Sequence, residues 1–129
     1  MLEAVERLKD HPAVLAWGVG NELEHLVEEG DNDQEMVTAI WQAINQTAAM
    51  VKDVDPNHPT VAVTADLGEW HIVDNATQLA TYCPNIDIWG VNAYETLPDI
   101  REKIDAGPWD RPYLVPEYGP SGWWGALKT

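Results

Sequence analysis

The feature that most constrains this chain is a regular alternation of short apolar runs with stretches of helical spacing. A continuous apolar run is typical of a strand that is buried on both faces, as in a parallel sheet. Strands that alternate with helices imply parallel pairing through helical crossovers. The sequence therefore predicts an α/β fold with strands over 13–19, 60–64, 86–91 and 112–115, and with helices over 2–8, 35–51, 71–81 and 98–104.

The longest predicted helix carries its own start and stop signals. Asn32 and Glu35 resemble a capping box at its beginning. The helix should end before Asp55 and Pro56, because the residue preceding a proline disfavours the α conformation. No linker or internal repeat divides the 129 residues, so we expect a single segment over 1–129.

Composition limits the classes of partner. Seven Lys and Arg stand against 22 Asp and Glu, a net charge of −15, which argues against a nucleic-acid or anionic-membrane partner. No apolar run approaches the roughly 20 residues of a membrane span. The single Cys83 cannot form an internal disulfide. The first residues read as a helix and not as a signal peptide, so the sequence predicts no particular localisation.

Polar side chains follow each predicted strand. In parallel α/β folds the ligand site lies at the carboxyl ends of the strands, so these residues should share one rim. Two carboxyl groups flanked by indole rings suit sugar chemistry, because one can protonate the leaving oxygen while the other acts at the anomeric carbon. The rim candidates are Asn21, Glu22, Asp66, Asn92, Tyr94 and Glu117, with Trp70, His71, Trp123 and Trp124 in the loops beyond.

Structural roles compete with this interpretation. A polar residue after a strand is ordinary, and Asp66 is better explained as a loop or capping residue than as a catalytic one. The acidic cluster over 24–33 has no zinc-ligand spacing and suits a solvated loop before a helix N-terminus, so no metal or other cofactor is expected. Trp17, Trp41 and Trp89 fall in predicted element interiors and should belong to the core.

Two longer motifs resemble a known family. The segment 11–22, HPAVLAWGVGNE, resembles strand four of the clan A glycoside hydrolases, and 111–119, RPYLVPEYG, resembles strand seven. The likeness is greatest to the catalytic barrel of the β-galactosidase/β-glucuronidase family, glycoside hydrolase family 2. It implies a partial TIM (β/α)8 barrel, made of strands four to seven, and a retaining double-displacement reaction.

The resemblance also implies roles for particular residues. Glu22 would be the acid/base and Asn21 would contact the sugar 2-hydroxyl. Glu117 would be the nucleophile. Asn92 and Tyr94 match the strand-six pattern less tightly, and a tyrosine there can orient the nucleophile by a hydrogen bond. The expected partner is a carbohydrate substrate, and the sugar and its linkage stay open.

The length leaves three interpretations. A TIM barrel has roughly 250 residues, and the resemblance covers about half of one. The chain could be part of a larger glycosidase, which we favour, and the remainder of the barrel would then be its partner. It could instead be a half-barrel that pairs with itself as a homodimer, or a non-catalytic carbohydrate-binding remnant.

Overall fold

A computed structural model of the chain describes residues 1–26, 34–66 and 68–119. These residues form a parallel sheet whose strands follow one another in the order of the chain, as consecutive strands of a (β/α)8 barrel do. The prediction of four parallel strands is thus confirmed. The strands are β1 (Trp17–Asn21), β2 (Thr60–Thr64), β3 (Ile88–Val91) and β4 (Tyr113–Leu114).

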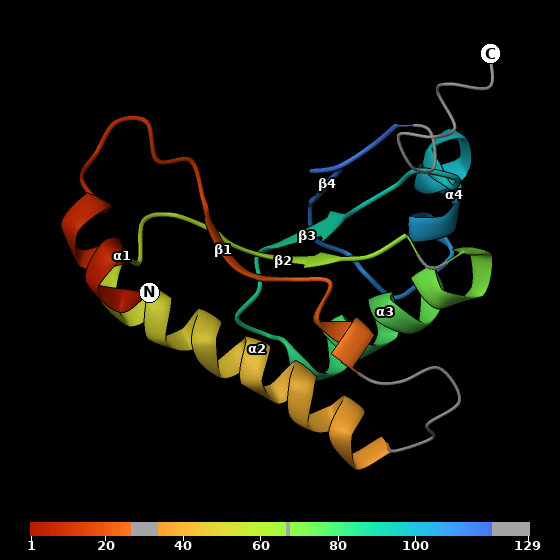
Figure 1. The fold of residues 1–129 in the computed structure, drawn as a ribbon, viewed down its shortest axis with the longest axis horizontal. Coiled ribbons are helices and arrows are strands. Elements are labelled where there is room, and N and C mark those ends of the chain that lie inside the picture. The colour runs from red at the N-terminus through yellow and green to blue at the C-terminus, as the bar shows by residue number, and fades with distance from the viewer. Residues whose placement is uncertain (27–33, 67, 120–129) are drawn as a thin grey trace.

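Helices connect successive strands. Figure 1 shows α2 and α3 along one face of the sheet. No helix in the described part of the chain is long and apolar enough to cross a membrane. The α-helices are α1 (Leu2–Leu8), α2 (Gln34–Val54), α3 (Gly68–Tyr82) and α4 (Ile100–Asp105), with short 3-10 helices η1 (Leu23–Leu26) and η2 (Leu97–Asp99).

The two faces of the sheet differ. Side chains alternate between faces along a strand, and those of Ala62, Trp89 and Val91 pack into the core under the helices. From α2 the core receives Trp41, Ile44, Ala48 and Val51, which recur at helical spacing. The opposite face carries the partly exposed side chains of Val63, Ile88 and Leu114.

The first predicted strand was wrong in its first half. Residues 13–16 form no strand, and β1 begins only at Trp17. The Val14 N–H donates to the His11 carbonyl at 3.0 Å, so a turn replaces the ladder there. Leu15 is 83% exposed. Within β1 only Val19 is buried, so this strand does not meet the expectation of burial on both faces.

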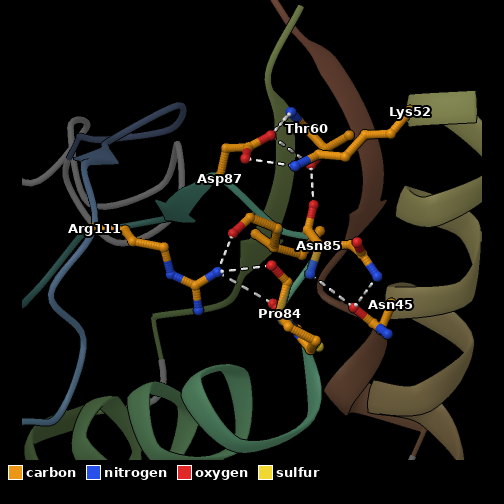
Figure 2. A network of polar contacts seen from close by, with 9 residues as sticks. Asn45, Lys52, Thr60, Pro84, Asn85, Asp87 and Arg111 are labelled. Carbon is orange, nitrogen blue, oxygen red and sulfur yellow. Dashed lines mark hydrogen bonds and ion pairs between the residues drawn. The ribbon is translucent and has the colours of Figure 1, made fainter. Parts of the chain in front are cut away.

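A polar network ties the amino ends of β2 and β3 to α2 (Figure 2). Lys52 Nζ lies 2.6 Å from Asp87 Oδ1, and the Thr60 N–H donates to Asp87 Oδ2 at 2.9 Å. Although burial opposes ionisation, these bonds hold the pKa of Asp87 below its usual range. Arg111 donates to the main-chain oxygens of residues 83, 84 and 86, before β3. In barrels this end of the sheet serves stability, and function belongs to the opposite end.

Candidate active site

Glu22 stands at the carboxyl end of β1 in an unusual conformation. Its φ of 51° makes it the one non-glycine residue with positive φ in the described ranges. Its N–H still donates to the Val63 carbonyl at 2.9 Å, after a register shift between Gly18 and Asn21. Bulges re-aim side chains, and left-handed residues concentrate at functional sites. The direction of the half-buried Glu22 side chain is therefore set by a backbone conformation that is unfavourable for a non-glycine residue.

A buried amide holds the Glu22 carboxylate. Asn92, which follows β3, is fully buried, and its Nδ2 donates to Glu22 Oε1 at 2.6 Å. The same nitrogen lies 3.5 Å from the side-chain oxygen of the exposed Asn21. Asn92 Oδ1 is buried without a hydrogen-bond partner in the described structure. The structure thus brings together three of the predicted site residues.

Glu117 is held by Tyr94, which follows β3 as Asn92 does. The Tyr94 hydroxyl donates to Glu117 Oε2 at 2.7 Å, and the Ala93 N–H donates to the Glu117 carbonyl at 2.9 Å. The hydrogen bond to Glu117 is the main reason why the pKa of Tyr94 is raised. Burial and the charges of neighbouring carboxylates act in the same direction. Tyr94 is accordingly a protonated donor at neutral pH.

The two holding residues are related by strand geometry. Asn92 and Tyr94 are two positions apart, the spacing that places extended side chains on the same side of a sheet. One contacts the carboxylate after β1 and the other contacts the carboxylate after β4. The carboxyl ends of β1, β3 and β4 therefore contribute to one polar site.

Two further carboxylates shape this rim, and their contacts were not predicted. Glu24 Oε1, from η1, accepts the Ala65 N–H at 2.5 Å. Asp66 lies in the loop after β2, as expected, and accepts hydrogen bonds from Tyr94, Glu95 and Thr96. Its position directly after a strand was the available sequence signal. Although burial opposes ionisation, the bonds from Thr96 and from three N–H groups lower the pKa of Asp66.

The aromatic predictions divide. Trp41 and Trp89 are 3% and 0% exposed, which confirms them as core residues, while Trp17 is partly buried against the core. Trp123 and Trp124 lie outside the described residues, as do the side chains of Trp70 and His71 in the first turn of α3. Among the described residues no group of three or more His, Cys, Asp or Glu could hold a metal ion.

Comparisons with known proteins agree with this architecture. The family described as "Glycosyl hydrolases family 2, TIM barrel domain" matches residues 1–126. A solved structure, "Ignisphaera aggregans GH53 catalytic domain", is similar in fold with a TM-score of 0.61 at 20% sequence identity. The likeness covers 88% of this chain but only 36% of that structure, so the chain spans about a third of its length. Comparison with the curated proteins found no match.

These matches confirm the partial (β/α)8 barrel that the sequence predicted. The structural likeness at this identity concerns the fold alone, whereas the family match covers nearly the whole chain. The chain belongs to the TIM barrel domains of glycosyl hydrolases family 2.

Proposed function

We propose that this chain carries the catalytic carboxylates of a retaining β-glycoside hydrolase. The observation that carries the proposal is the pair Glu22 and Glu117 at one sheet edge, each bound by a separate side chain from the end of β3. A carboxylate pair with separate partners suits a reaction in which the two groups play different roles. Membership of a glycosyl hydrolase family supports the same reaction class.

In the proposed first step, Glu22 protonates the glycosidic oxygen while the Glu117 carboxylate attacks the anomeric carbon. The carbon–oxygen bond to the leaving group breaks, and a glycosyl ester of Glu117 forms. Glu22, now ionised, then takes a proton from water, whose oxygen displaces Glu117. Two inversions return the original configuration, and this route requires carboxyl groups about 5–5.5 Å apart.

The side chains from β3 would support these roles. The hydroxyl of Tyr94 donates to Glu117 Oε2 and so orients the attacking carboxylate. Asn92 steers Glu22 through Oε1. Asn21, at the exposed end of β1, would bind the sugar 2-hydroxyl, and Trp70, His71, Trp123 and Trp124 remain proposed carbohydrate contacts.

Four strands are half of a barrel of eight. We propose that the other strands come from a longer polypeptide that contains this segment, and that they cover the face bearing Val63, Ile88 and Leu114. A second copy of the chain is the competing partner. Sedimentation of the isolated chain separates the two, because self-pairing gives twice the monomer mass over a range of concentrations.

The test is hydrolysis of aryl β-glycosides by this chain and by the complete polypeptide that contains it, with the product anomer followed by proton NMR. We expect the β-anomer to appear first. Glu117→Gln should abolish turnover, and Glu22→Gln should slow substrates with poor leaving groups most, because those need the proton. Glu95→Gln, an exposed carboxylate in the neighbouring loop, is the matched control and should remain active.

Two results would contradict the proposal: first appearance of the inverted anomer, or no hydrolysis by either form of the protein. Binding of oligosaccharides without turnover would favour the carbohydrate-binding remnant instead.

A further inference from the structure

The Asp66 carboxylate, which follows β2, is wrapped by the loop that follows β3. Its Oδ2 accepts the N–H groups of Tyr94 and Glu95, each at 2.6 Å, and lies 3.5 Å from the N–H of Thr96. Its Oδ1 accepts the Thr96 hydroxyl at 2.7 Å. Successive N–H groups that converge on one anion form a concave nest. Both oxygens of Asp66 are thus engaged with three consecutive residues of the next loop.

This contact fixes the residue that holds Glu117. Tyr94 is bound at both ends, through its N–H to Asp66 and through its hydroxyl to Glu117 Oε2. A tyrosine side chain has few rotatable bonds, so the position of its main chain largely determines where its hydroxyl lies. The buried Thr96, 5% exposed, anchors the other side of the same bend.

We infer that Asp66 is a positioning residue, which holds the main chain at 94–96 so that the Tyr94 hydroxyl meets Glu117. The inference rests on the proposed function, in which Glu117 is the nucleophile. Asp66 acts through Tyr94 and needs no contact with substrate. It differs from Asp87, which accepts a main-chain N–H in the same way but at the amino ends of the strands.

The phenol of Tyr94 offers a readout that does not depend on activity. Its pKa is raised chiefly by the hydrogen bond to Glu117, so displacement of the hydroxyl should lower that pKa towards the ordinary tyrosine value. The Tyr94 titration is the ultraviolet pH titration of the protein minus that of Tyr94→Phe. Circular dichroism checks that each variant is folded.

The two test variants both keep a carboxylate at position 66, because the negative charge there also raises the pKa of Tyr94 and should not be removed. Asp66→Glu lengthens the side chain and should displace the bend, whereas Thr96→Val removes a single donor and is the milder change. We expect both to lower the pKa of Tyr94, the first by more. Asp87→Glu is the matched control and should leave the Tyr94 titration unchanged. An unchanged Tyr94 pKa in both test variants would overturn the inference.

Kinetic measurements are a second, independent test, and they use whichever of the two forms of the protein hydrolyses aryl β-glycosides. Asp66→Glu should lower kcat/KM on the order of tenfold, as should Tyr94→Phe, which is typical for one hydrogen bond to a charged group. The double variant should be no worse than Tyr94→Phe alone, because both changes remove the same contact. Additive losses would contradict a role through Tyr94. If no glycoside is hydrolysed, the proposed function fails, and the phenol titration still decides the role of Asp66.

Discussion

The Asn92 side chain reaches across the sheet from the end of β3 to the end of β1, where its Nδ2 donates to Glu22 Oε1 at 2.6 Å. The strand β2 lies between these two strand ends in the sheet. Asn92 is fully buried, so its amide is held in place by packing while it directs a half-buried carboxylate. The left-handed backbone of Glu22 and this hydrogen bond to its carboxylate together set the direction of the side chain.

Asn92→Ala should lower hydrolysis roughly 10- to 100-fold, because a hydrogen bond to a charged group is lost and with it one restraint on the orientation of the Glu22 carboxylate. The measurement is kcat/KM together with circular dichroism. Asn45→Ala is the matched control, since Asn45 accepts two hydrogen bonds from Asn85 at the opposite end of the sheet. The control should lose stability but keep its activity per folded molecule. Equal activity in the two variants would refute a steering role for Asn92.

Two strand glycines should respond differently to a methyl group. A Cβ at Gly90 would lie 2.7 Å from Val63 Cγ2 and 3.3 Å from the Val63 Cα, whereas a Cβ at Gly18 meets nothing within 4 Å. Gly90→Ala should therefore lower the free energy of unfolding by about 1–3 kcal/mol, as overpacking does. Gly18→Ala should be neutral or stabilising by up to about 1 kcal/mol, because the unfolded chain loses freedom. Urea denaturation measures both, and equal effects would contradict the packing described for β2 against β3.

Asp55 should make the fold acid-sensitive. Burial opposes its ionisation, but hydrogen bonds outweigh burial and lower its pKa from 3.8 to about 2. Among these contacts, Trp17 Nε1 donates to Asp55 Oδ2 at 2.8 Å, and His58 Nδ1 lies 2.6 Å from the same oxygen. A depressed native pKa means that the unfolded chain binds the proton first as the pH falls. The contribution of ionised Asp55 to the free energy of unfolding is thus complete above about pH 4 and is lost between about pH 4 and pH 2.

Urea unfolding between about pH 2 and pH 6 tests this dependence. Asp55→Asn should be less stable than the parent at the upper end, and its stability should fall less steeply with acid. Trp17→Phe, which removes one donor to Asp55, should show an intermediate slope. Asp66 and Asp87 also have lowered pKa values, so some slope persists in every variant. Identical slopes in the parent and Asp55→Asn would refute the prediction.

Cys83 should be inert while the protein is folded. The thiol is fully buried beneath the helices and donates to the Trp41 carbonyl at 3.3 Å. Burial raises the pKa of Cys83 to about 11, although the nearby Arg111 acts against the shift. Since the thiolate is the reactive form, an aromatic disulfide reagent at about pH 8 should react at least about a hundredfold more slowly than with a free thiol. Urea should restore the ordinary rate, and rapid reaction without urea would contradict the burial of Cys83.

The sequence predicted the strand ends better than the strands themselves. Glu22, Asn92 and Glu117 all lie at the rim where the apolar runs placed them. The first strand was predicted to begin too early, because the apolar residues 13–16 resemble a buried run although the chain there leaves a turn and runs irregularly, with Leu15 exposed. Hydrophobicity alone does not distinguish a buried strand from an apolar turn at the edge of a sheet.

The contacts of Asp66 lay beyond sequence reasoning for a different reason. Its partners come from a loop about thirty positions further along the chain, and only parallel pairing of β2 with β3 in a given register brings them together. The same holds for Asn92 and Glu22, which are 70 positions apart. Neither pairing leaves a local pattern in the sequence.

The sequence by itself determined the alternation of strands and helices and the polar residues at the strand ends, because these follow from short-range apolar periodicity and turn chemistry. The family resemblance already implied a hydrogen bond from Tyr94 to Glu117, but only the tertiary structure decided that Asn92 holds Glu22 and that Asp66 holds the main chain at 94–96. That choice depends on strand register, on the register shift between Gly18 and Asn21 in β1 and on the left-handed backbone of Glu22. These features arise when strands pair and side chains compete for the same edge, and local periodicity does not encode them.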